Sequence, residues 1–160
     1  MLTVADITFD PITHRSTAKD GREVPHVTHV LEAVGVATDF AGLATFSPKT
    51  CEAIEDRRAL GSVVHADCHA FDDGDLVWES VDPRVLPYVD VSWRAVRENL
   101  GLVPLERERY LYHPLYHYAG IMDGLFSDRR GKVILPDLKI GDPEDAGAQF
   151  QTAAYEAAYR

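Results

Sequence analysis

The pattern of hydrophobic and polar positions changes twice in the first quarter of the chain. Residues 7–25 contain short β-type runs separated by an Asp-Pro and an Asp-Gly dipeptide, both of which favour turns, so they predict a small N-terminal β-hairpin. Residues 27–34 then place valine and leucine three and four positions apart and are followed by Gly35. That spacing predicts a short helix with a glycine C-cap.

Two longer helices are predicted next. Residues 47–71 begin with Ser47 as N-cap and a proline at the first helical position, and their apolar residues keep one helical stripe. Gly61 interrupts the stripe, where a glycine either kinks a helix or admits a close neighbour. Residues 82–100 predict a second helix between an Asp-Pro dipeptide and a glycine, with Pro87 as a residue that delays its start.

The second half of the chain changes to strand-like segments. Residues 102–114, 117–126 and 132–139 predict three strands joined by short turns, which favours an antiparallel meander. Asp142 and Pro143 then mark the start of an alanine-rich helix. This order predicts a mixed α/β or α+β fold, in which helices flank a mainly antiparallel three-strand meander and the small hairpin precedes it.

Composition indicates one globular domain of 160 residues, with the hairpin and first helices in 1–101 and the sheet and last helix in 102–160. No apolar run approaches the ~18–20 residues that span a bilayer. The first residues lack the basic and apolar segments of a signal peptide, so we expect a cytoplasmic protein without a membrane partner. Cys51 and Cys68 are too few for a disulfide scaffold and are predicted to be buried thiols.

The formal net charge of −10 argues against a protein that coats nucleic acid non-specifically, because lysine and arginine drive such binding. It does not argue against an enzyme that acts on nucleic acid. A carboxylate-rich site binds divalent cations, and the cations then meet the phosphates.

Candidate chemistry converges on three residues. Asp123 lies late in the second predicted strand, and Asp137 and Lys139 lie late in the third, two positions apart and therefore on one face. Adjacent strands are about 4.8 Å apart, so the two carboxylates can lie side by side, where a divalent ion such as Mg²⁺ or Mn²⁺ relieves their repulsion. The plainer interpretation is a surface Asp137–Lys139 ion pair and a turn residue at Asp123.

Two further polar features accompany these residues. Gln151 and Tyr155 are four apart on the last predicted helix and share a face, either as functional groups or as polar residues at the rim of the core. His65 lies on the apolar side of the long helix, where a lone histidine is more often a core residue than a ligand.

Taken in order along the chain, the pieces form a pattern that resembles the PD-(D/E)XK nuclease superfamily, and within it the RecB-like branch. That branch includes phage recombination exonucleases and the CRISPR-associated RecB-like exonucleases. Gly61 and His65, with three residues between them, resemble the glycine–histidine helix of that branch. The residues that carry the resemblance are His65, Glu108, Asp123, Asp137, Lys139, Gln151 and Tyr155.

The resemblance implies a restriction-endonuclease-like core and a Mg²⁺- or Mn²⁺-dependent deoxyribonuclease that hydrolyses phosphodiester bonds. It favours an exonuclease in phage or bacterial recombination or repair, with DNA as substrate and a recombination protein as a candidate partner. It implies that Lys139 orients the attacking water and that Gln151 and Tyr155 hold the DNA backbone or the lysine. The metal ligands that it implies are His65, Asp123, Asp137 and the Leu138 backbone carbonyl, with Glu108 as a further candidate.

One cofactor is not expected, and two alternatives remain beside this interpretation. Members of the branch with an iron–sulfur cluster need cysteines late in the chain, and none follows Cys68, so no cluster is expected. His65 and His69 form an i, i+4 pair that suits zinc, but a third ligand is not evident. A catalytically weak or inactive nuclease fold that binds DNA or protein with a partner is the second possible function.

Overall fold

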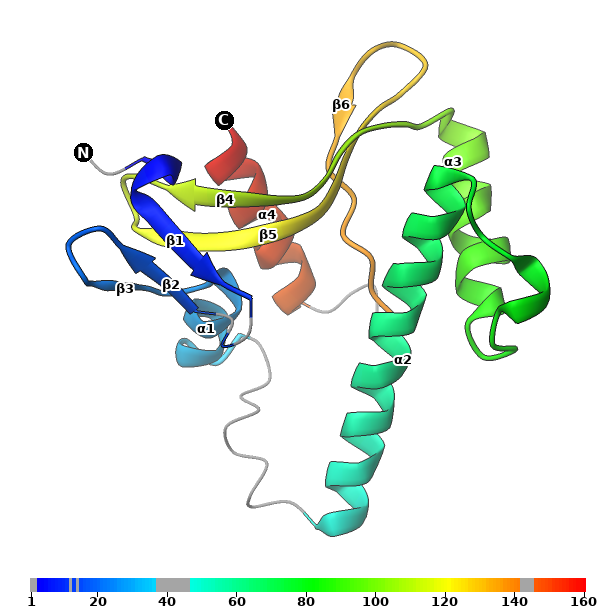
Figure 1. Cartoon of the computed structure of the whole chain (residues 1–160), viewed down its shortest axis with the longest axis horizontal. Coiled ribbons are helices and arrows are strands. Elements are labelled where there is room, and N and C mark those ends of the chain that lie inside the picture. The colour runs from blue at the N-terminus through cyan, green and yellow to red at the C-terminus, as the bar shows by residue number, and fades with distance from the viewer. Residues whose placement is uncertain (1–2, 12, 14, 37–46, 142–145) are drawn as a thin grey trace.

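The structure is a computed structural model that describes residues 3–11, 13, 15–36, 47–141 and 146–160 (Figure 1). Within these residues the chain forms two three-stranded antiparallel sheets and four α-helices, with shorter helical turns between them. The predicted mixed α/β composition is therefore confirmed.

The N-terminal sheet contains the predicted hairpin and one strand more. A short 3₁₀ turn, η1 (Val4–Asp6), leads into β1 (Ile7–Asp10), which pairs with β2 (Arg15–Ala18), and β2 pairs with β3 (Glu23–Val24). The chain then enters α1 (Val27–Ala33), the first helix that the sequence predicts.

The long helix α2 (Pro48–Asp73) begins as predicted, with the Ser47 hydroxyl accepting the Thr50 N–H at 3.2 Å. The helix passes through Gly61 without interruption. A Cβ atom at Gly61 would lie 3.7 Å from Ile140, so this glycine marks the close approach of a distant segment.

The helix predicted for residues 82–100 starts at Pro87, the residue expected to delay its start. After the 3₁₀ turn η3 (Trp78–Ser80), helical structure begins with the π-helix η4 (Pro87–Trp93) and continues as α3 (Arg94–Leu100). Pro87 occupies the first position, where its missing N–H costs nothing. The left-handed backbone of Gly101, with φ of 60°, ends α3.

The second sheet is the predicted meander, with β4 (Val103–His113), β5 (Tyr118–Ser127) and β6 (Val133–Ile134) in that order. The third strand lies within the predicted range 132–139 but is much shorter than predicted, because β6 has only two residues. Pro136 cannot donate a ladder hydrogen bond. The N–H of Leu138 donates to the side chain of Asp123 and not to a backbone carbonyl of β5.

The last helix, α4 (Ala146–Tyr159), follows the alanine-rich pattern of the sequence. The predicted cap at Asp142 and Pro143 lies outside the described residues.

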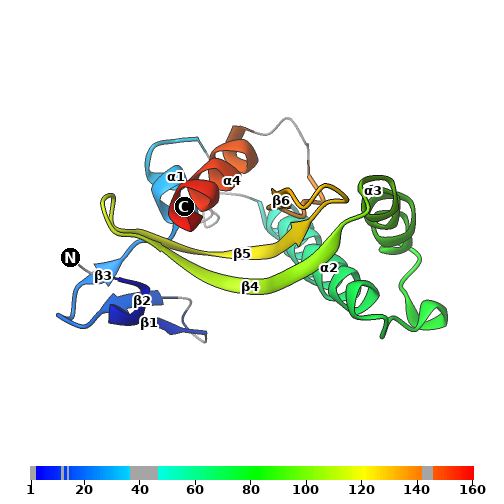
Figure 2. The ribbon, with the colours of Figure 1, turned by 90° about the horizontal axis from the view of Figure 1, so that it is seen from above.

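The curved β4–β5 ribbon organises the molecule (Figure 2). Helices α1 and α4 lie on one of its faces, the N-terminal sheet lies on the other, and α2 and α3 pack at the end where β6 joins. One buried cluster joins α1 and α4 to the ribbon, and a second joins α2, η4 and the β6 end. The first cluster includes Val27, Met122 and Tyr155, and the second includes Val64, Val89, Trp93 and Phe126.

Candidate active site

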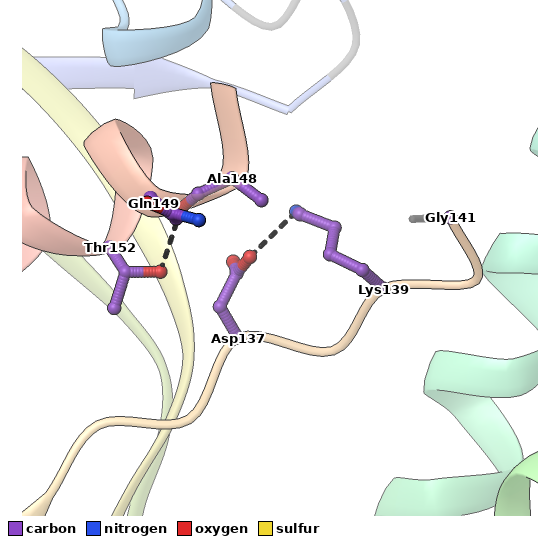
Figure 3. A pocket seen from close by; sticks show the side chains of 6 residues that line it. All are labelled: Asp137, Lys139, Gly141, Ala148, Gln149 and Thr152. Atoms are coloured by element: carbon purple, nitrogen blue, oxygen red, sulfur yellow. Dashed lines mark hydrogen bonds and ion pairs between the residues drawn. The ribbon is translucent and has the colours of Figure 1, made fainter. Parts of the chain in front are cut away.

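The segment after β6 crosses from the sheet to α2 without regular secondary structure, and it carries the D-x-K residues (Figure 1). Leu138 and Ile140 pack against the buried cluster of α2 and η4. Asp137 and Lys139 lie on the side of α4, as Figure 3 shows. Successive side chains of the segment therefore alternate between its two sides, as predicted for a strand. Packing of Leu138 and Ile140 maintains this alternation, because the segment has no strand ladder here.

Asp123 and His65 fix this segment at its centre. One carboxylate oxygen of Asp123 on β5 accepts the N–H of Leu138 at 2.7 Å, and the other lies 3.5 Å from Nδ1 of His65 on α2. The second ring nitrogen of His65, Nε2, lies 2.9 Å from the Leu138 carbonyl oxygen. The structure therefore brings together three of the predicted site residues from three separate elements.

Asp137 and Lys139 form a partly buried ion pair, with Lys139 Nζ 3.0 Å from Asp137 Oδ2 (Figure 3). The Asp137 side chain is only 6% exposed, and among the residues that the structure describes neither of its oxygens accepts a hydrogen bond of good geometry. Buried carboxylate oxygens without such bonds are uncommon in folded proteins, and a bound ion is one of the groups that can satisfy them.

Burial raises the pKa of Asp137, the nearby charge of Asp123 raises it further, and the Lys139 ammonium opposes both. Because the pKa of Asp137 is raised, the cost of burying its carboxylate exceeds the stabilisation from its ion pair with Lys139. A cation beside Asp137 would remove that cost.

Gln151 and Tyr155 meet on one face of α4, as their spacing predicts, and Gln151 Nε2 donates to the Tyr155 hydroxyl at 2.8 Å. Burial raises the pKa of Tyr155 to about 12; Gln151 acts in the opposite direction, and the carboxylates of Asp137 and Asp123 add to the rise. The phenol is therefore close enough to both carboxylates to sense their charge and stays protonated.

Gly120 is required for this arrangement and was not identified from the sequence. A Cβ atom on Gly120 of β5 would overlap the ring of Tyr155, so only glycine lets the phenol lie this close to the strand. A glycine inside a strand pattern is itself a signal for such a close approach.

A hollow of about 270 Å³ opens between the D-x-K segment and α4 (Figure 3). Asp137 and Lys139 line it from one side, and Gln149 and Thr152 line it from the other. Gln149 and Thr152 are not among the site residues predicted from the sequence, although they are two polar residues three apart on an alanine-rich helix. They face the ion pair more directly than Gln151 and Tyr155, which do not line the hollow.

Glu108 lies apart from Asp137, on β4, with His69 as its neighbour. Its Oε1 is 3.9 Å from Nδ1 of His69, and both residues line a second hollow beside α2 together with His65. Glu108 has a left-handed backbone with φ of 46°, a strained conformation for a residue with a side chain. The ring centroids of His65 and His69 are 6.5 Å apart, and each ring lies beside a different carboxylate.

The donors fit a divalent cation in part. No three His, Cys, Asp or Glu side chains converge on one metal position within the part of the chain that the structure describes. His65 Nε2 and the Leu138 carbonyl, two of the predicted ligands, are hydrogen-bonded to each other. The buried oxygens of Asp137, which accept no hydrogen bond of good geometry in the described part of the chain, are groups that a cation would satisfy.

Comparison with known proteins finds no match for this chain. No protein-family model matches the chain, and neither a curated protein nor a solved structure matches it. Among the described residues, no helix has both the length and the apolar character needed to cross a membrane.

Proposed function

We propose that this chain is a metal-dependent DNA nuclease of the PD-(D/E)XK type, related to the RecB-like branch, that hydrolyses phosphodiester bonds. The observation that carries the proposal is the Asp137–Lys139 pair. Within the described residues, a buried carboxylate whose oxygens accept no hydrogen bond of good geometry lies 3.0 Å from an ammonium group, beside a hollow. Asp123 adds a second carboxylate whose charge acts on Asp137.

Each side chain has a role that follows from its position. Lys139 is 37% exposed at the hollow, so its ammonium group can hold the attacking water against the phosphorus and favour loss of the water's proton. Gln149 can donate a hydrogen bond to a phosphate oxygen that enters the hollow. The Thr152 hydroxyl donates to the Ala148 carbonyl at 3.0 Å, so it would have to exchange this bond for one to the phosphate. The hydrogen bond from Gln151 to Tyr155 keeps the buried phenol in place beside the carboxylates.

The residues that would hold Mg²⁺ or Mn²⁺ are Asp137, Asp123, His65 and the carbonyl of Leu138. When bound, the ion supplies positive charge for the charge that builds on the phosphate in the transition state. For an ion to bind there, the hydrogen bond between His65 Nε2 and the Leu138 carbonyl would have to break. The packing of Leu138 and Ile140 would still keep the segment in place.

The test is digestion of end-labelled linear DNA and closed circular DNA with Mg²⁺ or Mn²⁺ by the wild type and by Asp137→Asn. We expect metal-dependent cleavage by the wild type and a loss of at least a hundredfold in the variant, as for removal of a central catalytic group. Asp75→Asn is the matched control, because it removes the same charge at an exposed turn after α2.

Two outcomes would contradict the proposal. One is wild-type cleavage by Asp137→Asn, because the site would then lie elsewhere. The other is the absence of cleavage with either ion. If DNA binding that depends on a divalent ion persisted in that case, the second candidate function, an inactive nuclease-like binding module, would replace the first.

A further inference from the structure

An apolar pocket lies on the far side of the D-x-K segment from the hollow described above. Its volume is about 500 Å³, and it is enclosed by α2, η4, α3 and the segment itself. Its apolar lining comes from Val64, Cys68, Tyr88, Trp93, Val96 and Leu138.

The pocket and the polar hollow share one wall. Asp137, Lys139 and Gly141 line both spaces, so an occupant of the pocket lies next to the Asp137–Lys139 pair. A ligand that reaches both sides must be charged at one end and apolar at the other. A nucleotide unit of DNA has this character, with an anionic phosphate and a flat base whose faces are apolar.

From this adjacency we infer that the pocket receives one unstacked nucleobase of the strand that is cut, an inference that rests on the proposed nuclease function. A paired base inside a duplex cannot leave its stack without the cost of unpairing. The substrate class is therefore single-stranded DNA, or a duplex end that frays into a single strand.

Tyr88 is the side chain that contacts the face of the base. The indole of Trp93 is fixed, because its N–H donates to Asp72 at 3.0 Å and its ring packs edge-on against Phe126. Trp93 is also only 5% exposed and forms the floor of the pocket. Tyr88 lies at the pocket with its ring partly buried, and aromatic rings are the usual platform for bases of any sequence.

The helix that carries Tyr88 is itself unusual. Tyr88 and Ser92 both lie on the π-helix η4, and the Ser92 hydroxyl donates to the Pro87 carbonyl five residues earlier at 3.3 Å. π-Helical turns are rare and occur frequently at functional sites. The wide turn sets the Tyr88 ring and the Ser92 hydroxyl against the same pocket, one for the face of a base and the other for its polar edge.

The experiment measures how Tyr88 and the base depend on each other. A short labelled single strand, the same strand with one abasic position moved along it, and a blunt duplex are bound in Ca²⁺ and cut in Mn²⁺. The proteins are the wild type and Tyr88→Leu, which keeps an apolar side chain in the core cluster but removes the aromatic face. Tyr116→Leu, at an exposed tyrosine of the β4–β5 turn, is the matched control.

We expect Tyr88→Leu to weaken binding of the intact strand about tenfold, the size expected for one base–aromatic stack. The wild type should lose a similar factor at one abasic position, and the variant should lose nothing further there. An equal abasic effect in both proteins, or a preference of the wild type for blunt duplex, would overturn the inference. If DNA is cleaved but the effects of Tyr88→Leu and of the abasic position are independent, the inferred base pocket is wrong and the nuclease function stands. If no substrate is cleaved, the nuclease function and the base pocket are both wrong. Thermal melting of Tyr88→Leu verifies that the variant is folded.

Discussion

The carboxylate of Asp123 accepts the backbone N–H of Leu138 at 2.7 Å, across fifteen residues of chain. This hydrogen bond stands where a ladder bond between β5 and β6 would otherwise continue. It holds the D-x-K segment against the sheet after the strand has ended, and so places Asp137 within range of the charge of Asp123.

The first prediction concerns this hydrogen bond. Asp123→Ala removes the acceptor, and a hydrogen bond to a charged group contributes ~1.5–3 kcal/mol. We expect hydrogen exchange at the Leu138 amide to become at least tenfold faster in EDTA, while amides in the middle of α2 keep their protection. Asp123→Asn retains an acceptor oxygen and should show a smaller effect. Unchanged exchange in Asp123→Ala would mean that packing of Leu138 alone holds the segment.

The second prediction concerns stability and pH at Asp137. Because burial raises the pKa of this carboxyl, the folded protein binds a proton more tightly than the unfolded chain does. The contribution of Asp137 to the free energy of unfolding therefore falls as pH rises from the pKa of its carboxyl in the unfolded chain through the raised pKa in the folded protein. At neutral pH the ionised group lowers stability. We expect Asp137→Asn to melt a few degrees above the wild type in EDTA at neutral pH.

Two further measurements check this explanation. The difference in Tm should shrink as pH falls through the raised pKa, because the wild-type carboxyl is then neutral too. Mn²⁺ should raise the Tm of the wild type and leave that of Asp137→Asn nearly unchanged. A variant that is less stable than the wild type at neutral pH would show that the Lys139 ion pair outweighs burial.

A third prediction compares two glycines. Gly120→Ala puts a methyl group into the ring of Tyr155, so we expect a loss of ~1–3 kcal/mol in stability and weaker cleavage as the phenol and Gln151 move. Gly61→Ala lies inside α2 and meets only Ile140, at 3.7 Å, so it should stabilise the protein by ~0.5–1 kcal/mol. Thermal melting of the two variants checks the opposite signs, and a stable Gly120→Ala would show that the ring can shift without cost.

The fourth prediction concerns a buried ion pair at the end of α2. The side chain of Asp72 is only 1% exposed, forms an ion pair with Arg97 and accepts a hydrogen bond from the indole N–H of Trp93. Asp72→Ala leaves both donors buried without their acceptor, which should cost ~3–5 kcal/mol and lower the Tm by roughly 10 °C. The exposed pair of Glu156 and Arg160 is the control, because Glu156→Ala should change stability by less than ~0.5 kcal/mol. Similar losses in the two variants would contradict the assignment of Asp72 as a buried partner.

Several elements follow from the sequence because their causes are local. The cap at Ser47 and the apolar stripe after it fix α2 within its own residues, and Gly101 ends α3 as expected. Asp137 and Lys139 lie on one side because two positions of extended chain always return a side chain to the same side. Gln151 and Tyr155 meet for the corresponding reason on a helix.

The tertiary structure decided what depends on contacts between distant residues. The sequence could not show that the N–H of Leu138 donates to Asp123 and shortens the third strand to two residues, because the acceptor is fifteen residues away. Nor could it show that Tyr155 needs the bare backbone of Gly120, or that Gln149 and Thr152 face the ion pair. Local periodicity places a side chain on a face of its own element, but only the packing of one element on another determines what that face meets.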